Sequence, residues 1–265
     1  MFELDRARIR IAACLPLLAG LLLLAGCGGS SAIACSSGEC TRILFLGNSY
    51  TYVNDLPSTL AQLAGSGGHP VQVAMVANGG ETLTEHASSS DSLSEISSER
   101  WSYVVLQEQS ETPATSGGRT AMYPAVRALV ARIRSDGAAP MLFLTWAHRD
   151  GLPTAGLADY QSMQLQISNA YLAIAGELGA PVAPVGNAWS SVRHDHPEIS
   201  LWADDGSHPD QAGTYLAACV FYAAIFKQSP DGLRYHGGVG NDQALVLQDE
   251  ARRQVLDHLA QWGIR

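Results

Sequence analysis

The chain has 265 residues, of which 46% are hydrophobic and 15% are charged. This composition is typical of a globular protein rather than of a disordered or coiled-coil one. The 16 Lys and Arg residues against 25 Asp and Glu residues give a net charge of -9, and no run of basic residues follows position 10. The charge balance disfavours nucleic acid and anionic membrane surfaces as partners and favours a small or neutral substrate.

The first 26 residues have the pattern of an export signal. Three arginines precede an uncharged apolar run at positions 11–25, and a Leu-Ala-Gly-Cys sequence then ends at Cys27. The run is shorter than the roughly 20 residues that a membrane-spanning helix needs. The pattern resembles a bacterial lipoprotein signal, which implies that Cys27 is acylated and becomes the first residue of the mature chain. We therefore predict an exported, lipid-anchored protein of the cell envelope, on the periplasmic face of the outer membrane if the host has one.

Residues 28–39 are rich in Gly, Ser and Ala, which is typical of a flexible tether. We expect a signal peptide over 1–26, a tether over 27–40 and one folded domain over 41–265. In an oxidising compartment, Cys35 and Cys40 have the spacing to close a small disulfide loop, although the sequence leaves that pairing open. Cys219 lies in an apolar stretch and is expected to be buried and unreactive.

Short apolar runs alternate with longer amphipathic stretches along the domain. The runs predict buried strands at 42–46, 71–76, 103–106, 141–145 and 181–185, and the longer stretches predict helices at 56–64, 119–134, 159–178, 211–226 and 241–262. This alternation indicates an α/β fold, a three-layer α/β/α arrangement with a flavodoxin-like parallel sheet of about five strands. In such a sheet, ligands bind beyond the carboxyl ends of the strands.

Ser49 follows the first predicted strand and precedes a helix. Gly47 allows a tight turn there, which would place the serine hydroxyl at the carboxyl edge of the sheet. A serine at such a position is also a common helix cap, so the turn alone does not establish catalysis.

Asp205 precedes His208 by three residues near the end of the domain. A carboxylate at this offset can reach back to the ring of the histidine and fix its tautomer, while the other ring nitrogen faces a serine. The alternative is an ordinary turn before a helix that Asp210 caps. A serine together with a distant Asp-x-x-His indicates a serine hydrolase more strongly than either feature alone.

Four segments together resemble, in chain order, the four sequence blocks of the SGNH (GDSL-type) hydrolases. They are Gly47-Asn48-Ser49-Tyr50, Gly79-Gly80, Gln107-Glu108-Gln109-Ser110 and Asp205-x-x-His208. The resemblance implies that Ser49 is the nucleophile, His208 the general base and Asp205 its orienting acid. It also implies an oxyanion hole made of the main-chain N-H groups of Ser49 and Gly80 and a side-chain amide from the third block.

The third block departs from the family pattern, because two glutamines stand where Gly-x-Asn is usual. Counting from the strand end places Gln109 at the Asn position, and its amide can donate the same hydrogen bond. Gln107 has the same strand parity and is the reserve candidate. In the first block, Asn48 replaces the usual Asp, a mild change for a side chain that organises a turn.

Other motifs have weaker functional interpretations. The sequence has no Gly-x-Ser-x-Gly elbow, which disfavours an α/β-hydrolase, and it has no phosphate loop. His194 and His196 are more typical of a solvated surface than of a metal site, so no metal is expected. No cofactor is expected either. His86 and Trp146 lie near the predicted site as candidate substrate contacts, although each residue has an equally good structural interpretation.

These observations favour a lipid-anchored serine esterase that acts through an acyl-serine intermediate, with an O-acetylated carbohydrate as one candidate substrate. The alternative is a non-catalytic envelope lipoprotein that binds a glycan in an SGNH-like pocket, and the irregular third block motivates it. The expected partners are therefore an ester or glycan ligand and, through the lipid on Cys27, the membrane.

Overall fold

Five parallel strands form the central sheet of residues 40–265, which are the residues that the computed structural model describes. The strands are β1 (Thr41–Gly47), β2 (Val71–Ala77), β3 (Tyr103–Leu106), β4 (Ala139–Phe143) and β5 (Val182–Ala183). Their order is β2-β1-β3-β4-β5, and all four pairings are parallel. This order confirms the flavodoxin-like α/β fold. Helices cover both faces of β1, so its residues Ile43 to Leu46 are completely buried and apolar.

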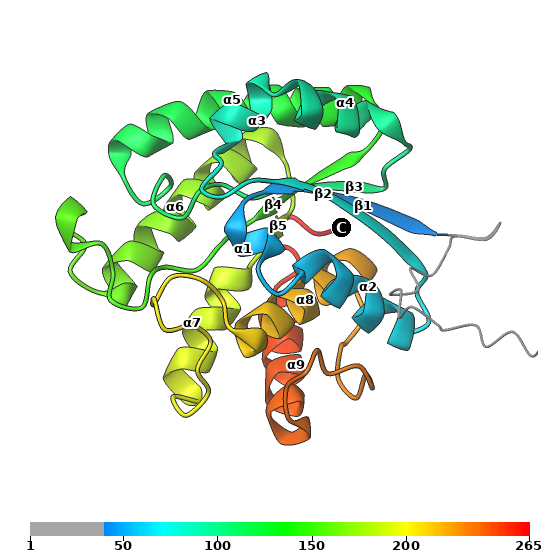
Figure 1. Cartoon of the computed structure of the whole chain (residues 1–265), viewed down its shortest axis with the longest axis vertical. Coiled ribbons are helices and arrows are strands. Elements are labelled where there is room, and N and C mark those ends of the chain that lie inside the picture. The colour runs from blue at the N-terminus through cyan, green and yellow to red at the C-terminus, as the bar shows by residue number, and fades with distance from the viewer. Residues whose placement is uncertain (1–39) are drawn as a thin grey trace, which may run out of the picture. The chain divides into compact units, whose positions relative to one another are not determined.

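The helices lie in two layers (Figure 1). One layer holds α3 (Leu83–Ser88), α4 (Ser90–Ser98), α5 (Ser116–Ser135) and α6 (Tyr160–Leu178), and the other holds α2 (Leu56–Ser66), α7 (Val185–Asp195), α8 (Gln211–Phe226) and α9 (Asn241–Leu256). A short α1 (Ser49–Tyr52) follows β1, and a 3-10 turn spans Pro153–Ala155. Helix α8 is apolar around its circumference because 14 of its residues are buried between the sheet and its neighbouring helices.

Several predicted boundaries are wrong. The last helix ends at Leu256 rather than at 262, because the chain then turns back and the main-chain oxygen of Trp262 accepts a hydrogen bond from Val182. Strand β4 begins at Ala139 and ends at Phe143, two residues early at each end. Strand β5 has only two residues because it lies between two prolines, which lack a main-chain donor. Helices α3, α4 and α7 were not predicted.

Cys40 is disulfide-bonded, and Cys219 is free and buried. The predicted partner of Cys40, Cys35, lies outside the described residues, as do the predicted signal and the lipid attachment site. Among residues 40–265, no helix combines the length and the hydropathy needed to cross a membrane.

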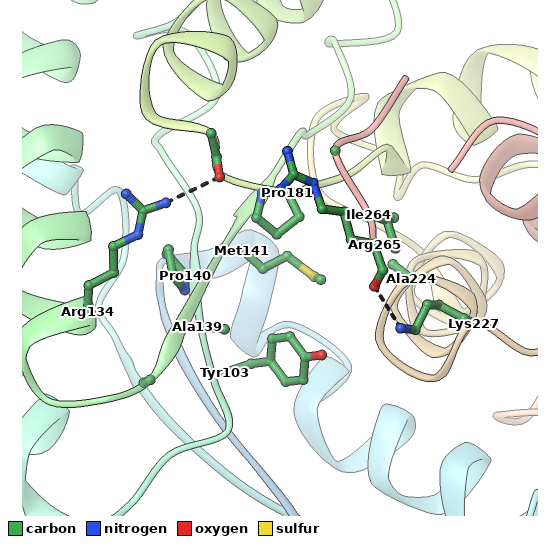
Figure 2. A pocket seen from close by; sticks show the side chains of 13 residues that line it. Tyr103, Arg134, Ala139, Pro140, Met141, Pro181, Ala224, Lys227, Ile264 and Arg265 are labelled. Carbon is green, nitrogen blue, oxygen red and sulfur yellow. Dashed lines mark hydrogen bonds between the residues drawn. The ribbon is translucent and has the colours of Figure 1, made fainter. Parts of the chain in front are cut away.

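The strand order reverses between β1 and β3, so the carboxyl ends of these two strands flank the switch point at which ligands bind in such sheets. A cavity of about 370 Å³ lies at the other end of the strands, where Tyr103 begins β3 and Ala139 begins β4 (Figure 2). Two of its basic side chains bind main-chain oxygens, since Arg134 donates to Leu178 and Lys227 donates to Arg265. Its position excludes this cavity as the site predicted around Ser49.

Candidate active site

The turn after β1 places Ser49 at the first position of α1. Asn48 caps this helix, because its side-chain oxygen accepts a hydrogen bond from the main-chain nitrogen of Tyr50 at 3.1 Å. A Cβ atom on Gly47 would lie 2.4 Å from the hydroxyl oxygen of Thr51, so no larger residue fits there. The close turn leaves Ser49 partly exposed at the sheet edge.

A hydrogen-bonded relay joins Ser49, His208 and Asp205. The Oγ atom of Ser49 lies 2.9 Å from Nε2 of His208, and Nδ1 of His208 lies 2.5 Å from Oδ2 of Asp205. Because the carboxylate holds the proton on Nδ1, Nε2 is left as an acceptor for the serine hydroxyl.

The loop from Asp205 to His208 is itself held in shape. Oδ1 of Asp205 accepts main-chain hydrogen bonds from Ser207 and His208, both at 2.9 Å, and Gly206 has a positive φ of 70°. The hydrogen bond from His208, followed by those from the main chain, lowers the pKa of Asp205 to about 2. Asp205 is therefore ionised throughout the neutral range and stabilises a positive charge on His208.

Gly80 lies in an exposed turn with a positive φ of 71°. The side chain of Glu81 fixes this turn by accepting hydrogen bonds from the main-chain and side-chain nitrogens of Asn78. The main-chain oxygen of Glu81 also accepts a hydrogen bond from the side chain of Asn48 at 3.0 Å. The Gly80 turn is thus tied directly to the Ser49 turn.

The side chain of Gln109 is oriented by its oxygen. Oε1 accepts hydrogen bonds from the main-chain nitrogens of Glu111 at 2.8 Å and Thr112 at 3.0 Å. Within the described residues, its Nε2 makes only a long contact of 3.4 Å with the hydroxyl of Ser110. The amide of Gln109 is therefore held in place while a donor hydrogen stays available.

No family model matches the sequence, and no curated protein matches it. A solved structure from Slackia heliotrinireducens, described as an SGNH hydrolase, is 33% identical; the match covers 71% of this chain and 100% of that one, with a TM-score of 0.62. This chain belongs to the SGNH hydrolases.

Two further solved structures share the fold of this SGNH hydrolase. A DUF4886 family protein from Bacteroides uniformis is 20% identical over 84% of this chain and 95% of that one, with a TM-score of 0.67. A mutant of Axe2, an acetyl-xylooligosaccharide esterase from Geobacillus, is 15% identical over 68% of this chain and 92% of that one, with a TM-score of 0.54.

The structure corrects the prediction that His86 is a substrate contact. The side chain of His86 is completely buried. Nε2 lies 2.9 Å from the main-chain oxygen of Gly47, and Nδ1 lies 2.7 Å from the hydroxyl of Ser92. Because the Gly47 oxygen can only accept, Nε2 carries the proton. His86 holds the end of β1 rather than touching a ligand.

Trp146 is likewise not a substrate contact. It is completely buried between Tyr50 and Trp189, with ring centroids 4.5 Å and 3.9 Å away. Its indole nitrogen donates to the main-chain oxygen of Ser207 at 3.0 Å, and the hydroxyl of Tyr50 lies 2.8 Å from that of Ser207. The aromatic stack therefore positions the loop that carries His208.

Gln107 is excluded as the reserve oxyanion donor because both hydrogens of its amide are already used. Nε2 donates to Oδ1 of Asn48 at 2.9 Å and to the main-chain oxygen of Glu108 at 2.7 Å. Oε1 accepts from the main-chain nitrogen of Asn48 at 2.8 Å and from the hydroxyl of Thr51 at 3.0 Å. The side chain is completely buried and fixes the Ser49 turn.

Two features of the SGNH hydrolase site were not predicted. The hydroxyl of Ser110 lies 3.1 Å from Nε2 of His148, a partly exposed residue whose pKa is lowered by burial. Glu108 is a completely buried carboxyl group between the two glutamines. The only sequence signal for Glu108 was a charged residue two positions after the end of a buried strand. His194 lies in the last turn of α7 with its side chain exposed to solvent.

Proposed function

We propose that this SGNH hydrolase is a serine esterase that acts through an acyl-Ser49 intermediate. The observation that carries the proposal is the unbroken relay from Ser49 through His208 to Asp205, with distances of 2.9 Å and 2.5 Å. In the first step His208 takes the hydroxyl proton as Oγ attacks the ester carbonyl, and it then gives the proton to the leaving alcohol. In the second step His208 activates a water that releases the acid and restores Ser49.

The developing negative charge on the carbonyl oxygen needs donors that are already in place. We propose the main-chain N-H groups of Ser49 and Gly80 together with the side-chain amide of Gln109. The proposal is supported by the hydrogen bond that ties the Gly80 turn to Asn48 and by the available hydrogen on Gln109.

The acyl group that we propose is acetyl, carried by a carbohydrate. Two of the solved structures with this fold are described as an acetyl-xylooligosaccharide esterase and an acetyl xylan esterase. The net charge of -9 also suits a neutral sugar better than an anionic lipid surface.

We further propose that the hydrolase domain at 41–265 is exported behind a signal at 1–26 and joined by a tether at 27–40 to a lipid on Cys27. The support is the Leu-Ala-Gly-Cys junction that follows a short apolar run. A Cys27→Ser variant should lose incorporation of labelled fatty acid and no longer sediment with the membrane fraction. Labelling that persists in this variant would overturn the lipoprotein proposal.

Acetate release separates the esterase from a glycan-binding protein. Purified protein is incubated with acetylated xylooligosaccharides and with chromogenic esters of two to eight acyl carbons, with Ser49→Ala as the matched control. We expect release of acetate and a preference for the shortest chromogenic ester, both lost in the control. Binding of the oligosaccharide with no turnover by folded protein would contradict the esterase proposal.

A further inference from the structure

Glu108 is a buried carboxyl group for which the proposed reaction has no use. None of its side chain is exposed. Oε1 accepts main-chain hydrogen bonds from Leu83 at 3.2 Å and from Gln109 at 2.7 Å. Oε2 is buried and has no hydrogen-bond partner among residues 40–265. A buried carboxyl oxygen without a partner is costly and therefore requires an explanation.

The two hydrogen bonds of Oε1 join the two loops that carry the proposed oxyanion donors. Leu83 begins α3 three residues after Gly80, and Gln109 is the proposed side-chain donor. The main-chain oxygen of Glu108 accepts from Gln107, whose amide also binds Asn48 beside Ser49. Glu108 thus joins the turns that follow β2 and β3 directly, and it is linked to the turn after β1 through Gln107.

We propose that Glu108 is a positioning residue that fixes the Gly80 loop relative to Gln109, and that its neutral, protonated form is the one that supports the reaction. This inference rests on the proposed esterase function. It adds to that function a group that touches neither substrate nor Ser49 and that sets the geometry and charge of the oxyanion site.

The surroundings of Glu108 favour the neutral form. Burial raises the pKa of Glu108 to about 7, against the two main-chain hydrogen bonds, which lower it. The charged neighbour that acts on it is Glu85 of α3, a like charge that raises the pKa further. On the α6 side, the hydroxyl of Tyr171 accepts the main-chain N-H of Glu108 at 3.1 Å, and burial raises the pKa of Tyr171, which keeps it neutral.

Ionisation of Glu108 would place a fixed negative charge beside the site where the oxyanion forms. In a buried setting of low dielectric constant, that charge opposes the transition state. Activity therefore falls as the pH rises through the pKa of Glu108, so the pH profile has a falling limb in place of a high-pH plateau.

The first test needs no catalysis. Amide resonances of Leu83 and Gln109 and the side-chain carboxyl carbon of Glu108 are followed by NMR between pH 5 and 9 on uniformly labelled protein. We expect all three signals to titrate with one shared midpoint near neutral pH. The proposal is overturned if the carboxyl carbon titrates in the ordinary glutamate range or if the two amides do not follow it.

The second test compares pH profiles of kcat and KM for the wild type, Glu108→Gln and Glu85→Gln. The amide introduced by Glu108→Gln keeps the Oε1 acceptor without the charge, so we expect the falling limb to vanish and KM to stay within about twofold, since the group acts on transition-state charge. Glu85→Gln should keep the falling limb and shift its midpoint slightly down, because a like charge is removed. A falling limb that persists unchanged in Glu108→Gln would refute the proposal.

The two tests separate this inference from the proposed function. If no ester is turned over but the three NMR signals still titrate together, the esterase proposal fails while the joining of the two loops by Glu108 stands. If esters are turned over but the signals do not titrate together, the inference about Glu108 fails alone. The wild-type titration remains decisive even if Glu108→Gln does not fold.

Discussion

The turns after β1 and β3 meet at the same sheet edge, but Ser49 in the first turn is partly exposed, whereas Gln107 and Glu108 in the second are buried. The main chain of the turn after β1 donates a hydrogen bond to Gln107 and accepts one from His86, and the hydroxyl of Ser49 meets His208. The turn after β3 sends Gln107 and Glu108 inward, where both are completely buried. Residues suited to catalysis therefore serve as supports wherever the backbone turns them away from the open edge.

The largest expected effect comes from the relay. Ser49→Ala and His208→Ala should each lower kcat by about 10⁴-fold or more, and the double variant should be scarcely slower, because the two residues act as a unit. Steady-state kinetics on a chromogenic acetate ester and a thermal unfolding curve for each variant provide the check. Additive losses would show that the two residues work independently.

Replacing Gln109 should affect catalysis, whereas replacing Gln107 should affect stability. Gln109→Ala should lower kcat by about 10²- to 10³-fold with KM nearly unchanged, because its amide acts on charge that develops during the reaction. Its melting temperature should stay close to that of the wild type.

Gln107→Ala should instead destabilise the fold by about 1 to 3 kcal/mol, because it leaves buried groups of Asn48 and Thr51 without partners. Denaturant unfolding measures this loss. If Gln107→Ala is as stable as the wild type while Gln109→Ala is not, the two roles are reversed.

His86 gives a second test of the distinction between residues that support the Ser49 turn and residues that act on the substrate. His86→Ala should lower the unfolding free energy by about 1 to 3 kcal/mol, since the Gly47 oxygen loses its buried donor. KM values for short and long acyl esters should keep the same ratio as in the wild type. A changed KM ratio at unchanged stability would show that His86 contacts the substrate.

The smallest effect concerns stability in acid. The pKa of Asp205 is lowered to about 2, so its contribution to stability is complete above the ordinary aspartate pKa and is lost as the pH falls from about 4 towards 2. Unfolding curves of the wild type and Asp205→Asn should therefore converge as the pH falls through this range. Because Asp205 is half exposed, solvent screening keeps the difference small.

The sheet and the relay were predictable because both follow short local patterns. Apolar runs mark strands that are buried on both faces, and the Asp-x-x-His offset sets its own geometry within one turn. Helices α3 and α4 were not predicted because their segment is rich in serine and has few apolar residues. What marks their starts is capping, by Thr82 and Ser89, rather than periodicity.

The direction of a polar side chain was not predictable from residue type. Gln107 and Gln109 have the same strand parity, yet Gln107 is buried against Asn48 and Gln109 is partly exposed. Burial of Trp146 depends on stacking against Tyr50 and Trp189, which are distant from it in sequence. Such contacts are set by how the helices pack on the sheet, which periodicity does not encode.

Covalent trapping of Ser49 tests the central claim most directly. Protein treated with a serine-reactive phosphonate ester is digested, and the modified peptide is located by mass spectrometry, with Ser49→Ala and His208→Ala as controls. We predict one adduct on Ser49, none in Ser49→Ala, and strongly slowed labelling in His208→Ala, because the hydroxyl then lacks its base. An adduct on another residue, or no adduct on folded wild-type protein, would contradict the account.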